Sequence, residues 1–109
     1  MTDLFTEVMN CKTMDQCIEL VRRDTWCEYE EAEGWRECFA EVFAGVKKAL
    51  VLGEEVSLEK FDLVSDLALV VVCKRKNKKI KVTPDSLEFE KLSKSQALWI
   101  KSWKKYCCH

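Results

Sequence analysis

The sequence has few of the residues from which catalytic sites are usually built. Among 109 residues there are one histidine, three glycines and one proline, and the histidine is the last residue, His109. The sequence contains no phosphate-binding P-loop and no G-x-S-x-G nucleophile turn, two motifs that depend on glycine. We therefore predict that the protein is not an enzyme and that it uses no cofactor.

Long hydrophobic runs are also missing. The longest continuous apolar stretch covers residues 67–73, seven residues, whereas about 20 are needed to cross a bilayer. The first 25 residues contain no basic start followed by an apolar segment, which is the pattern of a secretory signal. We expect no membrane partner and a cytoplasmic location.

Cysteine, by contrast, is abundant. The seven copies are Cys11, Cys17, Cys27, Cys38, Cys73, Cys107 and Cys108. Disulfides are not the expected state of a chain without an export signal. Structural zinc takes four ligands, commonly from spaced pairs, but no Cys-x-x-Cys pair is present and adjacent cysteines form a poor chelate. We therefore expect reduced thiols, no metal site and a frayed tail at residues 107–109.

Charge is divided unevenly along the chain, although the net charge is −1. Residues 1–70 carry 7 cationic and 16 anionic side chains, whereas residues 71–109 carry 11 and 3. The two parts therefore have net charges of −9 and +8. A local positive potential in the second part can attract an anion even though the whole chain is nearly neutral.

Helical periodicity and capping signals predict four helices. A short helix is expected at 2–10, and a second at 14–24 after a capping box at 13–16. Apolar residues at helical spacing predict a long helix at about 30–51. A second capping box at 93–96 predicts a C-terminal helix.

The segment between these helices has the two-residue period of β-strands. We predict strands at 55–59, 63–74 and 78–83, with the last two joined by a tight turn at Lys76-Asn77. The predicted fold class is α+β: two N-terminal helices forming a pair like a helix-turn-helix, a three-stranded antiparallel sheet with a short hairpin arm, and a C-terminal helix. We expect residues 1–13 to be an N-terminal extension and 14–109 a single domain.

The predicted hairpin carries a dense group of cations at its tip. They are Lys74, Arg75, Lys76, Lys78 and Lys79. One interpretation is a contact with nucleic-acid phosphates, which releases counterions and weakens with salt. The other is a solvated turn whose lysines prevent edge-to-edge association of the sheet. The residues alone leave both interpretations open.

A second group mixes cations with aromatic rings near the C-terminus. Its members are Lys101, Lys104 and Lys105 with Trp99, Trp103 and Tyr106. Single-strand binders combine such residues to stack bases. Since Trp99 and Trp103 share one helical face, the preferred interpretation of these rings is a core or an interface.

Residues 39–61, FAEVFAGVKKALVLGEEVSLEKF, resemble the bacterial HU and IHF family of histone-like DNA-binding proteins. The resemblance is carried by an aromatic helical face, an Ala-Leu pair, Gly-Glu-x-Val-x-Leu and a strand that opens with phenylalanine. It continues downstream in Ile80-Lys-Val82, Pro84 and Phe89. The family's Arg-Asn-Pro arm tip is missing, so the chain resembles a divergent member with shortened arms.

The resemblance implies a homodimer and a function. It implies a core and dimer interface formed by Phe39, Phe43, Val46, Leu50 and Phe61. It also implies a nucleoid-associated protein that binds DNA weakly and without sequence preference, through the hairpin tip and with help from Lys101, Lys104 and Lys105. The alternative is an HU-like fold that has lost DNA binding and serves as a protein-interaction or regulatory module.

Overall fold

Four helices and a four-stranded antiparallel sheet form an α+β fold in the computed structural model, which describes residues 3–23, 25–65 and 68–107. The elements are α1 (Leu4–Asn10), α2 (Met14–Arg22), α3 (Glu28–Val42), β1 (Lys48–Val51), β2 (Glu54–Val64), β3 (Ala68–Arg75), β4 (Lys78–Val82), the 3-10 turn η1 (Pro84–Ser86) and α4 (Lys94–Cys107). Within the described ranges, no helix combines the length and the apolar character needed to cross a bilayer.

Both predicted capping boxes are present. At the start of α2, the backbone N–H of Gln16 donates to the hydroxyl of Thr13 over 3.1 Å, and the Gln16 side chain accepts from the Thr13 backbone over 3.3 Å. The same exchange joins Ser93 and Gln96 before α4, over 3.1 and 3.0 Å. Each box pairs backbone donors that the first helical turn leaves without a partner, and so fixes where the helix begins.

The predicted long helix at 30–51 is wrong in its last part. α3 ends at Val42, Gly45 follows with a φ of 91°, and the chain then enters β1. β1 pairs with β2 and buries Ala49 and Val51 on alternate positions. Apolar residues in this stretch fit both a helical and a strand period, and pairing with β2 selects the strand.

The sheet has four strands rather than the three predicted, in the order β1-β2-β3-β4. β2 extends to Val64, and Ser65 then reverses the chain with a φ of 54°. The strand predicted at 63–74 therefore covers the end of β2 and β3 as far as Lys74, and its residues 66–67 lie outside the described part of the chain. The apolar run hid this reversal because both strands are apolar on either side of it.

The β3–β4 hairpin has the tight turn that was predicted. Lys76 and Asn77 have φ values of 48° and 67°, and positive φ at both central residues is the requirement of a type I′ turn. The register pairs Lys74 with Lys79 and Arg75 with Lys78. All the predicted tip cations are therefore gathered within one hairpin end.

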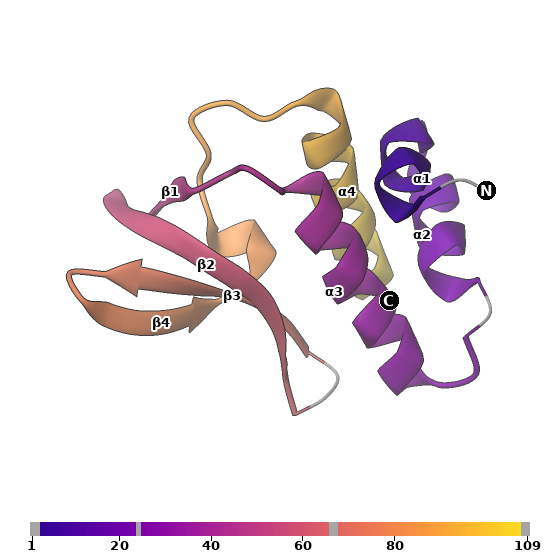
Figure 1. The fold of residues 1–109 in the computed structure, drawn as a ribbon, viewed down its shortest axis with the longest axis horizontal. Helices are drawn as coiled ribbons and strands as arrows, with labels where there is room; N and C mark the ends of the chain where they lie inside the picture. Colours follow the sequence, from indigo (N-terminus) through magenta and orange to yellow (C-terminus); the bar gives the residue numbers. More distant parts are fainter. Residues whose placement is uncertain (1–2, 24, 66–67, 108–109) are drawn as a thin grey trace.

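The helices cover one face of the sheet, as Figure 1 shows, and none of the described helices lies on the opposite face. The covered face carries the inward residues of β3, among them Leu69, Val71 and Cys73, all of them buried. We call the opposite side the helix-free face. Because side chains alternate along a strand, the neighbours of these inward residues point to the helix-free face.

The aromatic face of α3 lies in the core of a single chain. Phe39 and Phe43 are buried and their rings stack with centroids 5.6 Å apart, while Phe61 and Val46 pack beside them half-buried. The chain's own elements already cover Phe39 and Phe43, so these rings offer no exposed surface to a second copy. Leu50, which was expected in the core and dimer interface, is 37% exposed in the single chain and lies on β1 opposite Glu55.

The predicted N-terminal extension 1–13 joins this core through its described residues. Val8 on α1 is fully buried, and the indole N–H of Trp99 donates to the Val8 carbonyl over 3.1 Å. This bond ties α1 to α4. Trp99 is itself completely buried, so its ring is a core residue and has no surface on which a base could stack.

Candidate nucleic-acid interface

The hairpin tip gathers the five predicted cations at one end of the sheet. Lys74 and Arg75 end β3, Lys76 lies in the turn, and Lys78 and Lys79 begin β4. The four lysines are exposed and Arg75 is half-buried. The ammonium groups of the four tip lysines are therefore accessible to a ligand in the conformation that the structure shows.

The sheet register extends this positive surface beyond the tip. Lys48 lies opposite Ser57, Ser57 opposite Lys74, and Lys74 opposite Lys79. Residues directly opposite each other point to the same side of a sheet. Three lysines and a serine therefore form one row that crosses all four strands on the helix-free face.

A second row lies beside the first. Lys60 and Lys81 both lie opposite Val72, on either side of it. Val72 and Val70 are buried although none of the described helices covers this face. The aliphatic stems of long side chains can cover apolar surface while their charged ends stay in water. The helix-free face thus has an apolar centre with lysines on either side of Val72.

Sequence reasoning missed three members of this surface. They are Lys48, Lys60 and Lys81, and we call them, together with Lys74 and Lys79, the sheet-face lysines. Lys81 could have been found from the alternation of residues 79–82, since it falls on the same side as Lys79. Lys48 and Lys60 follow only from the register of β1 and β2.

Carboxylates of β2 lie among these cations. The ion pairs are Arg75–Glu54 at 3.4 Å, Lys48–Glu55 at 3.4 Å, Lys79–Glu59 at 3.7 Å and Lys60–Asp62 at 3.8 Å. The backbone N–H of Leu63 and, to a lesser extent, Lys60 lower the pKa of Asp62. The four strands and the β3–β4 turn carry eight cationic residues and four carboxylates, and their net charge is +4.

The C-terminal lysines do not join the hairpin tip. Lys101 and Lys104 are exposed on α4, which packs against α2 and α3 on the helix side of the sheet (Figure 1). The ammonium group of Lys105 pairs with Asp15 of α2 over 3.0 Å. The predicted set of eight binding cations is therefore split between two sides of the molecule.

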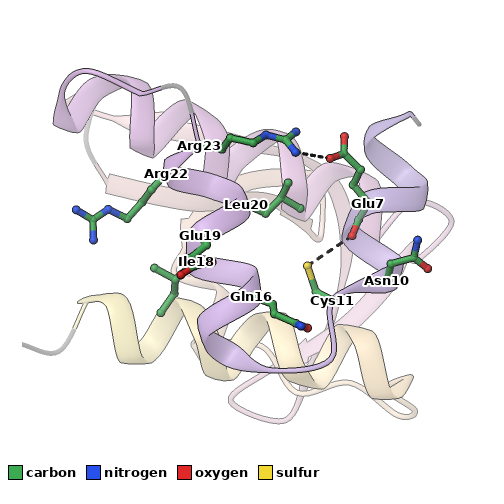
Figure 2. A pocket seen from close by; sticks show the side chains of 9 residues that line it. All are labelled: Glu7, Asn10, Cys11, Gln16, Ile18, Glu19, Leu20, Arg22 and Arg23. Atoms are coloured by element: carbon green, nitrogen blue, oxygen red, sulfur yellow. Dashed lines mark hydrogen bonds and ion pairs between the residues drawn. The ribbon is translucent and has the colours of Figure 1, made fainter. Parts of the chain in front are cut away.

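A separate groove lies between α1 and α2 and has a volume of about 760 Å³. Figure 2 shows that the guanidinium of Arg23 reaches across it to Glu7, over 2.6 Å, and that the Cys11 thiol points to the Glu7 carbonyl. Arg23 lowers the pKa of Glu7 through this hydrogen bond. The groove mixes charges of both signs and lies apart from the sheet-face lysines.

The described residues contain no group of three or more His, Cys, Asp or Glu side chains that could hold a metal ion. Among them, Cys11, Cys17, Cys27, Cys38 and Cys73 are free thiols. Burial raises the pKa of Cys17 and of Cys38 to about 12, so these thiols stay protonated. Of the predicted frayed tail, Cys107 is exposed at the end of α4, while Cys108 and His109 lie outside the described residues.

A scan against protein-family models, a search of curated proteins and a search of solved structures each found no match to this chain. The resemblance to HU and IHF, which spans about residues 14–103 and is strongest at 39–61, stays a prediction that rests on the sequence. In the structure, the stretch 39–61 comprises the end of α3, the whole of β1 and the first part of β2. Its Ala-Leu pair lies on a strand rather than at the end of a helix.

Proposed function

We propose that the protein binds the phosphate backbone of duplex DNA, without sequence preference, through the helix-free face of the sheet and the hairpin tip. The observation that carries this proposal is the row of Lys48, Lys74 and Lys79 across the four strands. Neighbouring strands lie about 4.8 Å apart, so the row holds several ammonium groups within reach of consecutive phosphates. The resemblance of residues 39–61 to a histone-like family supports the same function.

The chemistry of this face favours the backbone over the bases. Lysine ammonium groups act as point charges toward phosphates, whereas base recognition depends on bidentate donors in a groove. The aromatic rings of Trp99 and Phe39 are buried and cannot stack on bases. Binding should therefore be weak, tolerant of sequence and strongly dependent on salt.

The salt dependence can be sized from the surface. If each of the sheet-face lysines neutralises one phosphate, log K falls against log salt with a slope of about −4.5. A fourfold rise in salt then lowers the affinity roughly 500-fold. An aromatic-anchored protein contact would change far less, because its free energy comes mainly from apolar burial.

Fluorescence anisotropy of a labelled random-sequence duplex, titrated under reducing conditions at two salt concentrations, tests this proposal. Lys74→Glu with Lys79→Glu should lower the affinity at least about tenfold and reduce the salt slope by about 2. The opposed pair keeps like charges in both forms. The Lys79–Glu59 ion pair that is lost joins exposed or partly exposed side chains over 3.7 Å, so the hairpin should lose at most about 1 kcal/mol of stability. Lys101→Glu with Lys104→Glu is the matched control, because it changes the net charge equally on α4.

The comparison of these two variants decides between a local surface and a bulk charge effect. An equal loss of affinity in both variants would show that binding follows net charge alone. Absence of binding by the unaltered protein at low salt would refute the proposal and leave the lysines as a solvated face. The second candidate, a protein-interaction module, would then be favoured by Trp26, whose side chain is 91% exposed.

A further inference from the structure

The outer side of the helical layer carries a second groove, of about 510 Å³, between α1, α2 and α3. Its apolar lining, which we call the floor, consists of Leu4, Leu20, Val21, Gly34 and Cys38. The other lining residues, which we call the rim, are Thr25, Trp26, Tyr29, Glu30, Glu33, Glu37 and one cation, Arg23. The groove therefore combines an apolar floor with an acidic and aromatic rim.

The two aromatic rim residues are unusually exposed. Trp26, just before α3, is 91% exposed, and Tyr29, in the first turn of α3, is about half exposed. The position of Trp26 is fixed by its backbone N–H, which donates to the carboxylate of Glu30 over 2.6 Å. Tryptophan and tyrosine are the residues that most often anchor protein interfaces. An exposed tryptophan held beside an apolar groove indicates a docking surface.

The rim keeps a negative charge after its internal ion pairs are counted. α3 contains six glutamates and one arginine, Arg36. Arg36 pairs with Glu33 over 2.6 Å and approaches Glu37 at 3.9 Å, while Arg23 pairs with Glu7 across α1 and α2. Carboxylates still outnumber cations around the groove. A complementary surface would need an apolar group among cations.

The far end of the sheet has this composition. Leu52 lies in the β1–β2 turn with a φ of 50° and is 92% exposed. The ion pair of Glu54 with Arg75, at 3.4 Å, ties this turn to the β3–β4 hairpin. Leu52 is therefore an apolar side chain next to the cations of the hairpin tip. A bulky residue at positive φ is uncommon and strained, so Leu52 combines an unfavourable backbone conformation with an almost fully exposed apolar side chain.

We propose that the sheet end of one copy, with Leu52 and the hairpin tip, docks into the acidic groove of a second copy. Leu52 would cover the apolar floor and pack against Trp26, while the lysines of the tip form ion pairs with the glutamates of α3. The two surfaces lie on different parts of the fold, so each copy keeps one free end. Such a head-to-tail interface forms open chains or rings instead of a closed two-fold dimer.

Electrostatics argues against the two-fold alternative through the same surfaces. A groove facing a groove would bring two acidic rims together, and a tip facing a tip would bring two sets of lysines together. Like charges placed opposite each other disfavour an interface. The tip-to-groove arrangement is the combination in which the charges attract.

Sedimentation velocity of the nucleic-acid-free protein at low and high salt tests self-association. We expect the average mass to rise with protein concentration at low salt and to return to that of a monomer at high salt. Leu52→Asp and, separately, Trp26→Ala with Glu37→Lys should each abolish this rise. All three positions are exposed, and aspartate tolerates positive φ better than leucine, so the variants should fold. Leu92→Asp is the control: Leu92 is an exposed leucine that belongs to neither surface, and the control should associate normally.

Mixing the two defective proteins gives the decisive result. Leu52→Asp keeps its groove, and the Trp26→Ala, Glu37→Lys protein keeps its sheet end, so an equimolar mixture should form dimers and nothing larger. A mixture that stays monomeric, an unaltered protein that stays monomeric at low salt, or association that survives in either variant alone would overturn the proposal. The assay contains no nucleic acid, so its outcome is independent of the proposed DNA binding.

Discussion

Two carboxylates of β2 restrain the surface that we propose for DNA binding, and removing them should strengthen binding. Glu54 holds Arg75 at 3.4 Å and Glu59 holds Lys79 at 3.7 Å. A phosphate must compete with these carboxylates for the same cations. Glu54→Gln with Glu59→Gln would leave both cations available and would remove two negative charges from beside the hairpin tip.

The size of the gain follows from the geometry of the two pairs. Their side chains are 33–70% exposed, and exposed ion pairs contribute about 0.2–1 kcal/mol each. Releasing both should therefore improve the binding free energy by about 0.4–2 kcal/mol, a gain of roughly 2- to 30-fold in affinity. Lys79 is already one of the five phosphate contacts counted above, so only Arg75 adds a contact, and the salt slope should become steeper by about 1.

Anisotropy titration over a salt series measures both quantities. Glu19→Gln with Glu28→Gln is the matched control, because it removes two exposed carboxylates from helices on the other side of the sheet. The control changes the net charge by the same amount and should alter neither the affinity by more than about twofold nor the slope. The same gain in both proteins, or no gain in the β2 variant, would refute the role of the sheet face.

Two further predictions concern the folded core. Trp99→Phe removes the donor to the Val8 carbonyl. Because a buried acceptor loses its partner, the free energy of unfolding measured in urea should fall by about 1–3 kcal/mol. An unchanged unfolding midpoint would contradict this hydrogen bond. Burial raises the pKa of Cys17 and Cys38 to about 12, so these thiols should not react with a mild alkylating agent at neutral pH until the protein is unfolded. Mass spectrometry should find the exposed Cys27 alkylated under the same conditions. Equal labelling of all three would contradict their burial.

Local signals in the sequence predicted the parts of the fold that short segments determine. The capping boxes at 13–16 and 93–96 and the turn at Lys76-Asn77 depend on hydrogen bonds and φ angles within a few residues, and all three were confirmed. Gly53 follows the helix predicted at 30–51, and a glycine in that place commonly ends a helix with positive φ. It has a φ of 82°, but in the turn between β1 and β2, because conformational preference does not specify the elements on either side.

The errors lie where pairing between distant segments decides the structure. Residues 48–51 were assigned to a helix because Val46 and Leu50 fit a helical spacing, whereas pairing with β2 and the hydrogen bonds between Leu50 and Glu88, both at 2.8 Å, make them a strand. The reversal at Ser65 was invisible within a continuous apolar run. Pairing of this kind is a tertiary effect that overrides a local pattern.

The candidate site likewise has one part that local sequence predicts and another part that depends on pairing between distant segments. The hairpin tip could be predicted because its cations are neighbours in sequence. The row from Lys48 to Lys79 could not, because it exists only when four strands are in register. Lys101 and Lys104 were grouped with the tip by charge alone, and α4 places them on the other side of the sheet. A cluster of like charges in a sequence becomes one surface only if the topology brings it together.

The fold places the acidic and basic parts of the sequence on two separate surfaces. The acidic part supplies the groove along α3, and the basic part supplies the hairpin tip at the far end of the sheet. Both proposals place a polyanionic surface against the same tip, DNA phosphates in one and the glutamates of a second copy in the other. One tip cannot hold both partners at once, so DNA binding and head-to-tail association would exclude each other at each tip. The groove rim, Trp26 and Glu37, serves association alone, whereas Lys60 and Lys81 lie on the helix-free face and serve DNA binding alone. Substitutions at these four positions would therefore separate the two functions, although Lys74 and Lys79 contribute to both.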